Sequence, residues 1–496
     1  MELNSTSKSV EEKTRTINHE DGEAFEPFSN EMSLYKVTIN NLLENKYYED
    51  DEESFNNVKK AFDNVASDNP EFALKLADYA RNEMGLRDIS QVLLVLSALD
   101  SRTQEYVSEY GANIMSRADE PLKVLNFYIQ EKGNKSINEN LQKAIEDALH
   151  QYDEYQFAKY DRDSREMSYV DLFNLVHPNP RDNEHDEIFE SIVYGELDDY
   201  TDVEPLETPH TWETTISEKG NNTEAWRSVL DDMGLFATIR NARNMLEAGL
   251  SGEEIFGEFD DNDREWIKGA KLFPFRFYQS YKAITEACVD DRTSREWLQR
   301  AMEVSTDNLP ESLSSTAVGV DVSGSMNTLL SERSNMSYAE ISSFFGSLLY
   351  KLDARVFSFA TKVREVRDVR PEDTPMTIMD EIINANVSNG TNGYLIPKAL
   401  RENEVNVDRM VILTDMQMYN TNGYGTSTTF KEEFEKYKEE YPDTSLYMID
   451  VSSYGSLKTP ETMNDVYRIS GWNDNIIDFI EYAENENEII DEIEEY

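Results

Sequence analysis

Residues with the chemistry of a metal site lie at the ends of short apolar segments in the last third of the sequence. Asp321, Ser323 and Ser325 close one such segment, Thr391 lies in a loop with two glycines, and Asp415 ends another segment. A carboxylate and two hydroxyls in one turn suit a hard cation such as Mg²⁺, which prefers oxygen ligands. The sequence therefore predicts a divalent-metal site built from these five residues. The alternative for the Asp-x-Ser-x-Ser turn alone is a metal-free turn whose serines cap a helix.

The segments that must position these residues alternate in type. Apolar runs rich in β-branched and aromatic residues occur at 317–322, 355–360, 410–415 and 445–450, and helical patterns at 338–352 and 430–440 separate them. Strands that alternate with helices indicate a doubly wound parallel sheet, in which ligands bind beyond the carboxyl ends of the strands. We expect this α/β domain to span residues 311–496.

The sequence before this domain is typical of stacked helices. Apolar residues recur at helical spacing, as in Val58, Phe62 and Val65, and Pro and Gly are sparse and stand between the segments. We expect antiparallel helical repeats over 26–310, preceded by a polar, disordered tail over 1–25. The acidic stretch 183–222 is expected to form an insertion or long loop.

Composition limits the functions that the chain can have. The formal net charge of its 496 residues is −52, and it contains one cysteine, Cys288, and five histidines without zinc-ligand spacing. A chain-wide acidic excess destabilises a compact fold in dilute buffer, whereas molar salt shortens the screening length to about 3 Å. These features predict a cytoplasmic, halophilic protein. No nucleophile–base pair, phosphate loop or cluster of catalytic carboxylates is evident, so we expect a protein without enzymatic activity.

The metal residues resemble the metal-ion-dependent adhesion site of von Willebrand factor A-type domains. The resemblance rests on three separate pieces in the same order and covers the C-terminal third of the chain. It implies that Ser323, Ser325 and Thr391 ligate the metal directly, whereas Asp321 and Asp415 act largely through bound water. It also implies one open coordination position, which an acidic group of a partner protein can fill.

The helical part is similar to the TROVE module, which precedes an A-type domain in the Ro ribonucleoprotein family. The similar segments are residues 79–81, 86–87, 171–178, 226–233, 235–241, 271–277 and 281–282, with 469–472 and Ile480 near the end. The resemblance covers residues 30–496 with gaps around 105–165 and 183–222. It implies a ring of HEAT-like helical repeats that the A-type domain closes.

The resemblance implies that the protein binds RNA. Members of that family hold single-stranded RNA ends in the ring and small noncoding RNAs outside it, in RNA quality control or as adaptors for an exonuclease. The candidate contacts are Arg81, Arg87, His177, Arg240, Arg243, Arg276 and Lys282. The alternative for each arginine is an ion-paired structural residue, and for His177 a helix-end hydrogen bond. This chain departs from the family at residues 168–171 and at Asn174, where we expect basic residues for the outer RNA.

Two functions of different classes follow. The first is an RNA-binding ring; the second is a metal-dependent protein-binding or assembly module, which grips a partner through the A-type domain. The charge around the ring opening separates them, because basic residues there favour RNA and acidic residues favour a protein partner.

Overall fold

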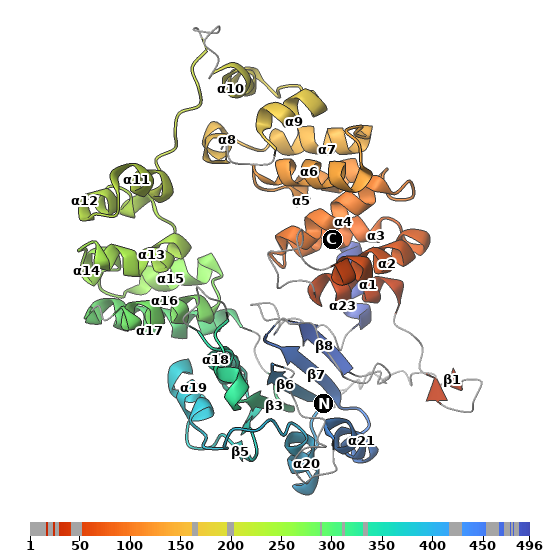
Figure 1. The fold of residues 1–496 in the computed structure, drawn as a ribbon, viewed down its shortest axis with the longest axis vertical. Coiled ribbons are helices and arrows are strands. Elements are labelled where there is room, and N and C mark those ends of the chain that lie inside the picture. Colours follow the sequence, from red (N-terminus) through yellow and green to blue (C-terminus); the bar gives the residue numbers. More distant parts are fainter. Residues whose placement is uncertain are drawn as a thin grey trace, which may run out of the picture.

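The chain folds into a ring in which two helical arms stand on a sheet domain (Figure 1). The computed structural model describes residues 16–17, 23–24, 29–40, 52–160, 167–195, 203–287, 290–309, 313–330, 336–415, 429–452, 466–470, 477, 480 and 486–496. The prediction of a helical ring closed by an α/β domain is confirmed. Cys288, the segment 471–472 and most of the tail 1–25 lie outside the described residues. The tail contributes a short antiparallel pair, β1 (Thr16–Ile17) and β2 (Glu23–Ala24).

The first arm, red to yellow in Figure 1, is a stack of helices. Its helices are α1 (Asn30–Asn40), α2 (Glu52–Asp68), α3 (Phe72–Asn82), α4 (Arg87–Leu99), α5 (Val107–Ile114), α6 (Glu120–Lys132), α7 (Glu139–Leu149), α8 (Glu154–Tyr160), α9 (Tyr169–Val176) and α10 (Asn183–Tyr194). The predicted amphipathic face of α2 is confirmed, since Val58, Phe62 and Val65 are all buried. No helix among the described residues is both long and apolar enough to cross a membrane.

The second arm, yellow-green to green, rises on the opposite side of the ring (Figure 1). It comprises α11 (Trp212–Lys219), α12 (Thr223–Arg227), η1 (Leu230–Asp232), α13 (Leu235–Glu247), α14 (Gly252–Ile255), α15 (Asp261–Ala270), α16 (Pro274–Glu286), α17 (Arg292–Ser305) and η2 (Thr306–Asn308). Helix α16 packs between α13 and α17. Phe275 and Phe277 of α16 are fully buried.

The expectation of an irregular loop over 183–222 is wrong in two places. Helix α10 starts where Asp182 accepts a hydrogen bond from the His185 amide at 3.0 Å, and it buries Ile188 and Ile192. Helix α11 starts with a capping box on Thr211. The helices have only 12 and 8 residues, so each is too short to show a long apolar period in the sequence.

The sheet domain contains the predicted doubly wound sheet. Its strands lie in the order β5-β4-β3-β6-β7-β8, and all neighbours are parallel except β4 and β5. The strands are β3 (Thr316–Asp321), β4 (Arg355–Phe359), β5 (Val363–Glu365), β6 (Arg409–Thr414), β7 (Ser445–Asp450) and β8 (Val466–Ser470). The predicted strand segments match β3, β4, β6 and β7 within two residues.

Helices cover both faces of this sheet. They are α18 (Tyr338–Lys351), α19 (Pro375–Ile383), α20 (Leu395–Glu402) and α21 (Phe430–Glu440), with the turn η3 (Gly324–Asn327) after β3. Alternate residues of β6 enter two different cores: Val411 packs with α18 and α19, and Ile412 packs with α20 and α21. Because a strand points successive side chains to opposite faces, its run of apolar residues is the signature of burial on both sides.

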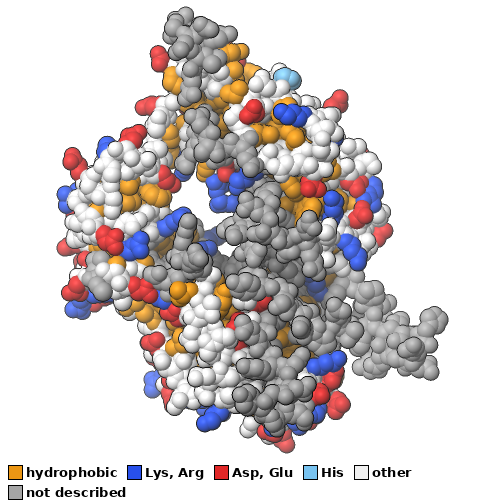
Figure 2. Space-filling view, in the orientation of Figure 1, with side chains coloured by type: hydrophobic (Ala, Val, Ile, Leu, Met, Phe, Trp, Pro, Cys, Tyr) orange, Lys and Arg blue, Asp and Glu red, His pale blue; other side chains and the backbone are white. Residues whose placement is uncertain are grey.

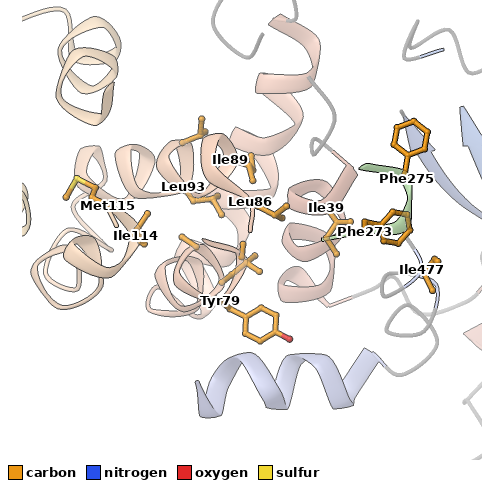
Figure 3. Close-up of a cluster of buried hydrophobic side chains, with 14 of the residues drawn as sticks. Ile39, Tyr79, Leu86, Ile89, Leu93, Ile114, Met115, Phe273, Phe275 and Ile477 are labelled. Atoms are coloured by element: carbon orange, nitrogen blue, oxygen red, sulfur yellow. The ribbon is translucent and has the colours of Figure 1, made fainter. Parts of the chain in front are cut away.

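The sheet domain closes the ring through contacts with both arms. On the second arm, Phe344 of α18 stacks on Tyr278 of α16, with ring centroids 4.9 Å apart. On the first arm, the C-terminal helix α23 (Glu486–Glu495) packs on α3, where the Tyr79 hydroxyl donates to Glu492 at 2.9 Å. Figure 3 shows the Tyr79 side chain directed at this helix. Each arm is therefore tied to the same domain, and the ring is continuous on the sheet side.

Candidate nucleic-acid interface and metal centre

The two acidic residues of the predicted metal site lie at one edge of the sheet. Asp321 is the last residue of β3 and Asp415 directly follows β6, and both side chains are buried. Val320 and Leu413 are partners in the parallel register of these neighbouring strands. The topology therefore brings both carboxylates to the same carboxyl-terminal edge.

The turn after β3 places the two serines beside Asp321. The Ser323 amide donates to one carboxylate oxygen of Asp321 at 2.9 Å, and the Thr414 hydroxyl donates to the other at 2.8 Å. The hydroxyl oxygens of Ser323 and Ser325 are 3.2 Å apart. The carboxylate of Asp321 is thus fixed, and two hydroxyls lie together at the start of η3.

The loop that carries Thr391 is attached to this turn. The Gly324 amide donates to the carbonyl of Asn389 at 3.2 Å, and the Asn392 amide donates to the carbonyl of Ala360 at the end of β4 at 2.9 Å. Thr391 itself is buried. The structure therefore gathers the predicted oxygen donors at one edge of the sheet.

Electrostatics at this edge suit a cation. Burial raises the pKa of Asp321 to about 6, against the hydrogen bonds from Ser323 and Thr414, and the charge of Asp415 raises it further. Within the described part of the chain, no Lys or Arg pairs with Asp321. Two buried carboxylates with adjacent hydroxyls form a donor set that fits Mg²⁺. The same part of the chain contains no group of three His, Cys, Asp or Glu residues that could hold a metal, so a cation at this edge would need hydroxyl or water ligands as well.

Sequence reasoning missed Asp450, a third buried acid at this edge. It ends β7 and accepts hydrogen bonds from the amide and hydroxyl of Ser452 at 2.9 and 2.6 Å. Burial raises its pKa, and the charge of Asp415 raises it further. The available signal was a repeated tripeptide, because Asp-Val-Ser occurs at both 321–323 and 450–452.

The predicted RNA contacts Arg81 and Arg87 lie in one group on the first arm. Arg81 is buried and donates to both carboxylate oxygens of Glu120, at 2.9 and 3.2 Å. Arg87 begins α4, and in the described part of the chain it makes no hydrogen bond or ion pair. Partial desolvation lowers the pKa of Arg87, as do the positive charges of Arg117 and Arg81. Arg117, which also lies over the Tyr160 ring at 4.9 Å, was missed from the sequence.

The other three arginine contacts gather on α13 and α16. Arg240 and Arg243 are exposed on α13, and Arg243 lies 3.9 Å from Glu247. Arg276 on α16 lies over the ring of Phe236, 5.8 Å from its centroid. Phe236 is 43% exposed and one helical turn before Arg240. Sequence reasoning missed this phenylalanine, although its spacing to Arg240 was available as a signal.

The remaining two candidates lie elsewhere. Lys282 forms salt bridges with Glu286 at 3.5 Å and with Glu340 of α18 at 2.5 Å, at the contact between the second arm and the sheet domain. His177 ends α9 with a left-handed backbone (φ 52°) and an exposed ring. At the other end of α9, where basic residues were expected, Ser168 and Asp171 form a capping box.

Basic side chains gather around the opening of the ring. Figure 2 shows Lys and Arg side chains at the opening, both on the side of α4–α6 and on the side of α13–α16, while most Asp and Glu side chains in this view lie on the outer surface. In a chain whose net charge is −52, basic residues around the opening favour RNA over a protein partner.

Comparison with known proteins decides the family. The sequence model of the TROVE domain matches residues 8–203 and 204–367. The chain belongs to the TROVE domain family. The second TROVE match runs past the helical arms and includes β3, α18, β4 and β5.

One solved structure and two curated proteins are similar to this TROVE chain. The crystal structure of the Deinococcus radiodurans RO (RSR) protein matches with a TM-score of 0.68 at 15% identity, over 91% of this chain and 99% of that one. This match establishes the shared fold. Telomerase protein component 1 of Rattus norvegicus is 23% identical over 292 residues, and that of Mus musculus is 23% identical over 297 residues. These matches cover 43% and 44% of the TROVE chain but only 11% of each relative, so this chain spans a small part of their length.

Proposed function

We propose that this protein is an RNA-binding ribonucleoprotein component that holds single-stranded ends of noncoding or misfolded RNA in its ring. The observation that carries the proposal is the concentration of Lys and Arg at the ring opening of an otherwise acidic molecule. Membership of the TROVE family and the resemblance to Ro ribonucleoproteins support it. The proposed role is binding in RNA quality control and does not include catalysis.

The surface on α13 and α16 has the chemistry that single-stranded RNA requires. Arginine binds phosphate through paired hydrogen bonds and stacks on bases, and an exposed aromatic ring accepts any base. Arg240 and Arg243 are placed to bind phosphate. Phe236, whose ring lies beneath Arg276, offers a surface for base stacking. Because stacking does not depend on ionic strength as phosphate contacts do, Phe236 keeps its contribution in concentrated salt.

A charge-reversal experiment tests this surface. The Arg240→Glu/Arg276→Glu double variant is compared with the wild type by fluorescence anisotropy of a labelled single-stranded RNA, at several KCl concentrations. We expect at least a tenfold loss of affinity at low salt, where phosphate contacts contribute most. The matched control is Arg292→Glu/Arg367→Glu, which changes the net charge equally at two exposed arginines outside both arginine groups.

Equal losses in both double variants would mean that net charge alone weakens binding, and the proposed surface would be wrong. Absence of RNA binding by the wild type at every salt concentration would overturn the proposed function itself.

We further propose that the chain works in a salt-rich cytoplasm. The net charge of −52 supports this, since self-repulsion of that size is removed only by strong screening. Refolding yields in 50 mM and 2 M KCl test it; equal yields would contradict the proposal.

A second proposed activity belongs to the edge of the sheet. We infer that this von Willebrand factor A-type domain binds Mg²⁺ with Ser323, Ser325 and Thr391, assisted by Asp321 and Asp415, and that the metal can receive a carboxylate from a protein partner such as an exonuclease. The buried like-charged pair supports it. Isothermal titration with Mg²⁺ tests it directly, and absence of binding at millimolar concentration would exclude the metal-dependent role.

A further inference from the structure

A hollow lies between the two helical arms, next to the α13 surface. It has a volume of about 360 Å³, at the lower end for small-molecule sites. Three segments enclose it: α8 of the first arm, the beginning of α11, and the junction of η1 with α13. The lining residues are Tyr155, Lys159, His210, Thr211, Trp212, Glu213, Val229, Asp232, Met233, Gly234 and Ala237.

Aromatic rings from both arms contribute to the hollow. Tyr155 on α8 is 48% exposed, and the ammonium of Lys159 lies 5.7 Å from the centroid of its ring. Trp212 stacks on the buried Trp226, with centroids 6.1 Å apart and planes 17° apart. The indole of Trp226 is in turn fixed by a 2.6 Å hydrogen bond to Asn221. The Trp212 ring is therefore held by its neighbours, whereas the Tyr155 ring is accessible.

The polar groups of the hollow include both donors and acceptors. Lys159 and His210 can donate, and the carboxylates of Glu213 and Asp232 can accept; His210 lies 4.0 Å from Asp232. Gly234 is the N-cap of α13 and provides no side-chain cap, and the position of a Cβ atom on Gly234 has no neighbour within 4 Å. The first amides of α13 are thus left for a ligand or water.

We propose that this hollow binds one nucleobase of the RNA strand held in the ring, and this rests on the proposed RNA-binding function. Two aromatic rings and a mixed donor–acceptor lining match a flat base with hydrogen-bonding edges. Gly234, which precedes α13, and Ala237 of its first turn both line the hollow, so the hollow lies at the same end of α13 as Phe236. The carboxylates of Glu213 and Asp232 would repel a phosphate group. The hollow therefore suits the base of a nucleotide and not its phosphate.

Abasic scanning tests the proposal on the full chain. A set of single-stranded RNAs, each with one abasic position, is titrated against the wild type and against Tyr155→Ala. The wild type is expected to lose about fivefold to a hundredfold in affinity at one position. In Tyr155→Ala the abasic RNA and the intact RNA are expected to bind with much more similar affinity, because the base and the ring are coupled. Tyr155 is half exposed, so its truncation leaves the core intact.

Two controls complete the experiment. Tyr155→Phe keeps the ring and is expected to restore the positional loss, whereas Trp266→Ala removes an exposed indole outside the hollow and is expected to leave the profile unchanged. Free nucleoside monophosphate distinguishes the source of the base: competition at millimolar concentration, with no position-dependent loss in the RNA, would assign the hollow to a free nucleotide and overturn the proposal. A flat profile in a wild type that binds RNA would also overturn it and leave the RNA-binding function intact. Absence of any RNA binding would overturn both the base-binding proposal and the proposed RNA-binding function.

Discussion

Buried carboxylates have different neighbours in the first arm and at the edge of the sheet. In the arm, buried Glu120 is matched by the guanidinium of Arg81 at 2.9 Å. At the sheet edge, buried Asp321 faces hydroxyls and amides, and the nearest ionic influence on it is the like charge of Asp415. A buried ion pair needs nothing from outside the chain, whereas a buried carboxylate such as Asp321, next to the like charge of Asp415, is relieved by a proton or a cation. The Arg81–Glu120 pair therefore stabilises the fold, whereas the acids at the sheet edge form a site that suits a cation.

The largest expected effect comes from removing one member of the buried ion pair. Arg81→Ala leaves the carboxylate of Glu120 buried without its partner, and we expect the free energy of unfolding to fall by about 3–5 kcal/mol. Urea denaturation monitored by circular dichroism measures this. The Arg81→Ala/Glu120→Ala double variant is expected to regain part of the loss; no regain would show that Glu120 is not the group left unpaired.

The next effect is a pH dependence that comes from buried Asp321. Without divalent cations, the pKa of Asp321 is about 6 in the folded state and near 3.8 in the unfolded state. The folded chain therefore binds this proton more tightly, and its stability falls as the pH rises from about 4 to 6, by about 3 kcal/mol. Denaturation curves at several pH values measure this against Asp321→Asn, which lacks the dependence. Identical pH profiles for both proteins would contradict the account.

A similar but slightly smaller effect is expected from Mg²⁺ at neutral pH. At a hundred times its dissociation constant, a cation bound only to the folded state stabilises it by about 2.7 kcal/mol. Thermal unfolding with and without MgCl₂, at constant ionic strength, measures the shift. We expect Arg81→Ala to show the same shift as the wild type, and Asp321→Asn to show little or none. A shift retained in Asp321→Asn would place the cation elsewhere.

The smallest expected change in stability comes from Arg87, which is compared with Arg81 in the same arm. Arg87 lies in the same group as Arg81 but makes no hydrogen bond or ion pair in the described part of the chain. We expect Arg87→Ala to change the free energy of unfolding by less than about 0.5 kcal/mol and to weaken RNA binding. Urea denaturation measures the free energy of unfolding, and fluorescence anisotropy on the same preparation measures RNA affinity. A large loss of stability would mean that Arg87 is structural, like Arg81.

Much of the fold, and the position of the candidate metal residues at one edge of the sheet, was accessible from the sequence, because local patterns specify them. The runs that became β3 and β6 are apolar on both faces, and parallel strands necessarily bring residues at their ends together. The partner of Arg81 was not accessible, since Glu120 is 39 residues away on another helix. Phe236 was not identified because an aromatic residue in an amphipathic helix is usually core, and only the packing leaves it 43% exposed.

The central claim, that the ring holds single-stranded RNA, is tested most directly by photo-crosslinking a 4-thiouridine RNA to the protein in 2 M KCl with Mg²⁺. Mass spectrometry then identifies the crosslinked peptides. The account predicts peptides from α13 that contain Phe236 or Arg240, and their loss in the Arg240→Glu/Arg276→Glu variant. Crosslinks confined to α17 or α21, or unchanged in that variant, would contradict it.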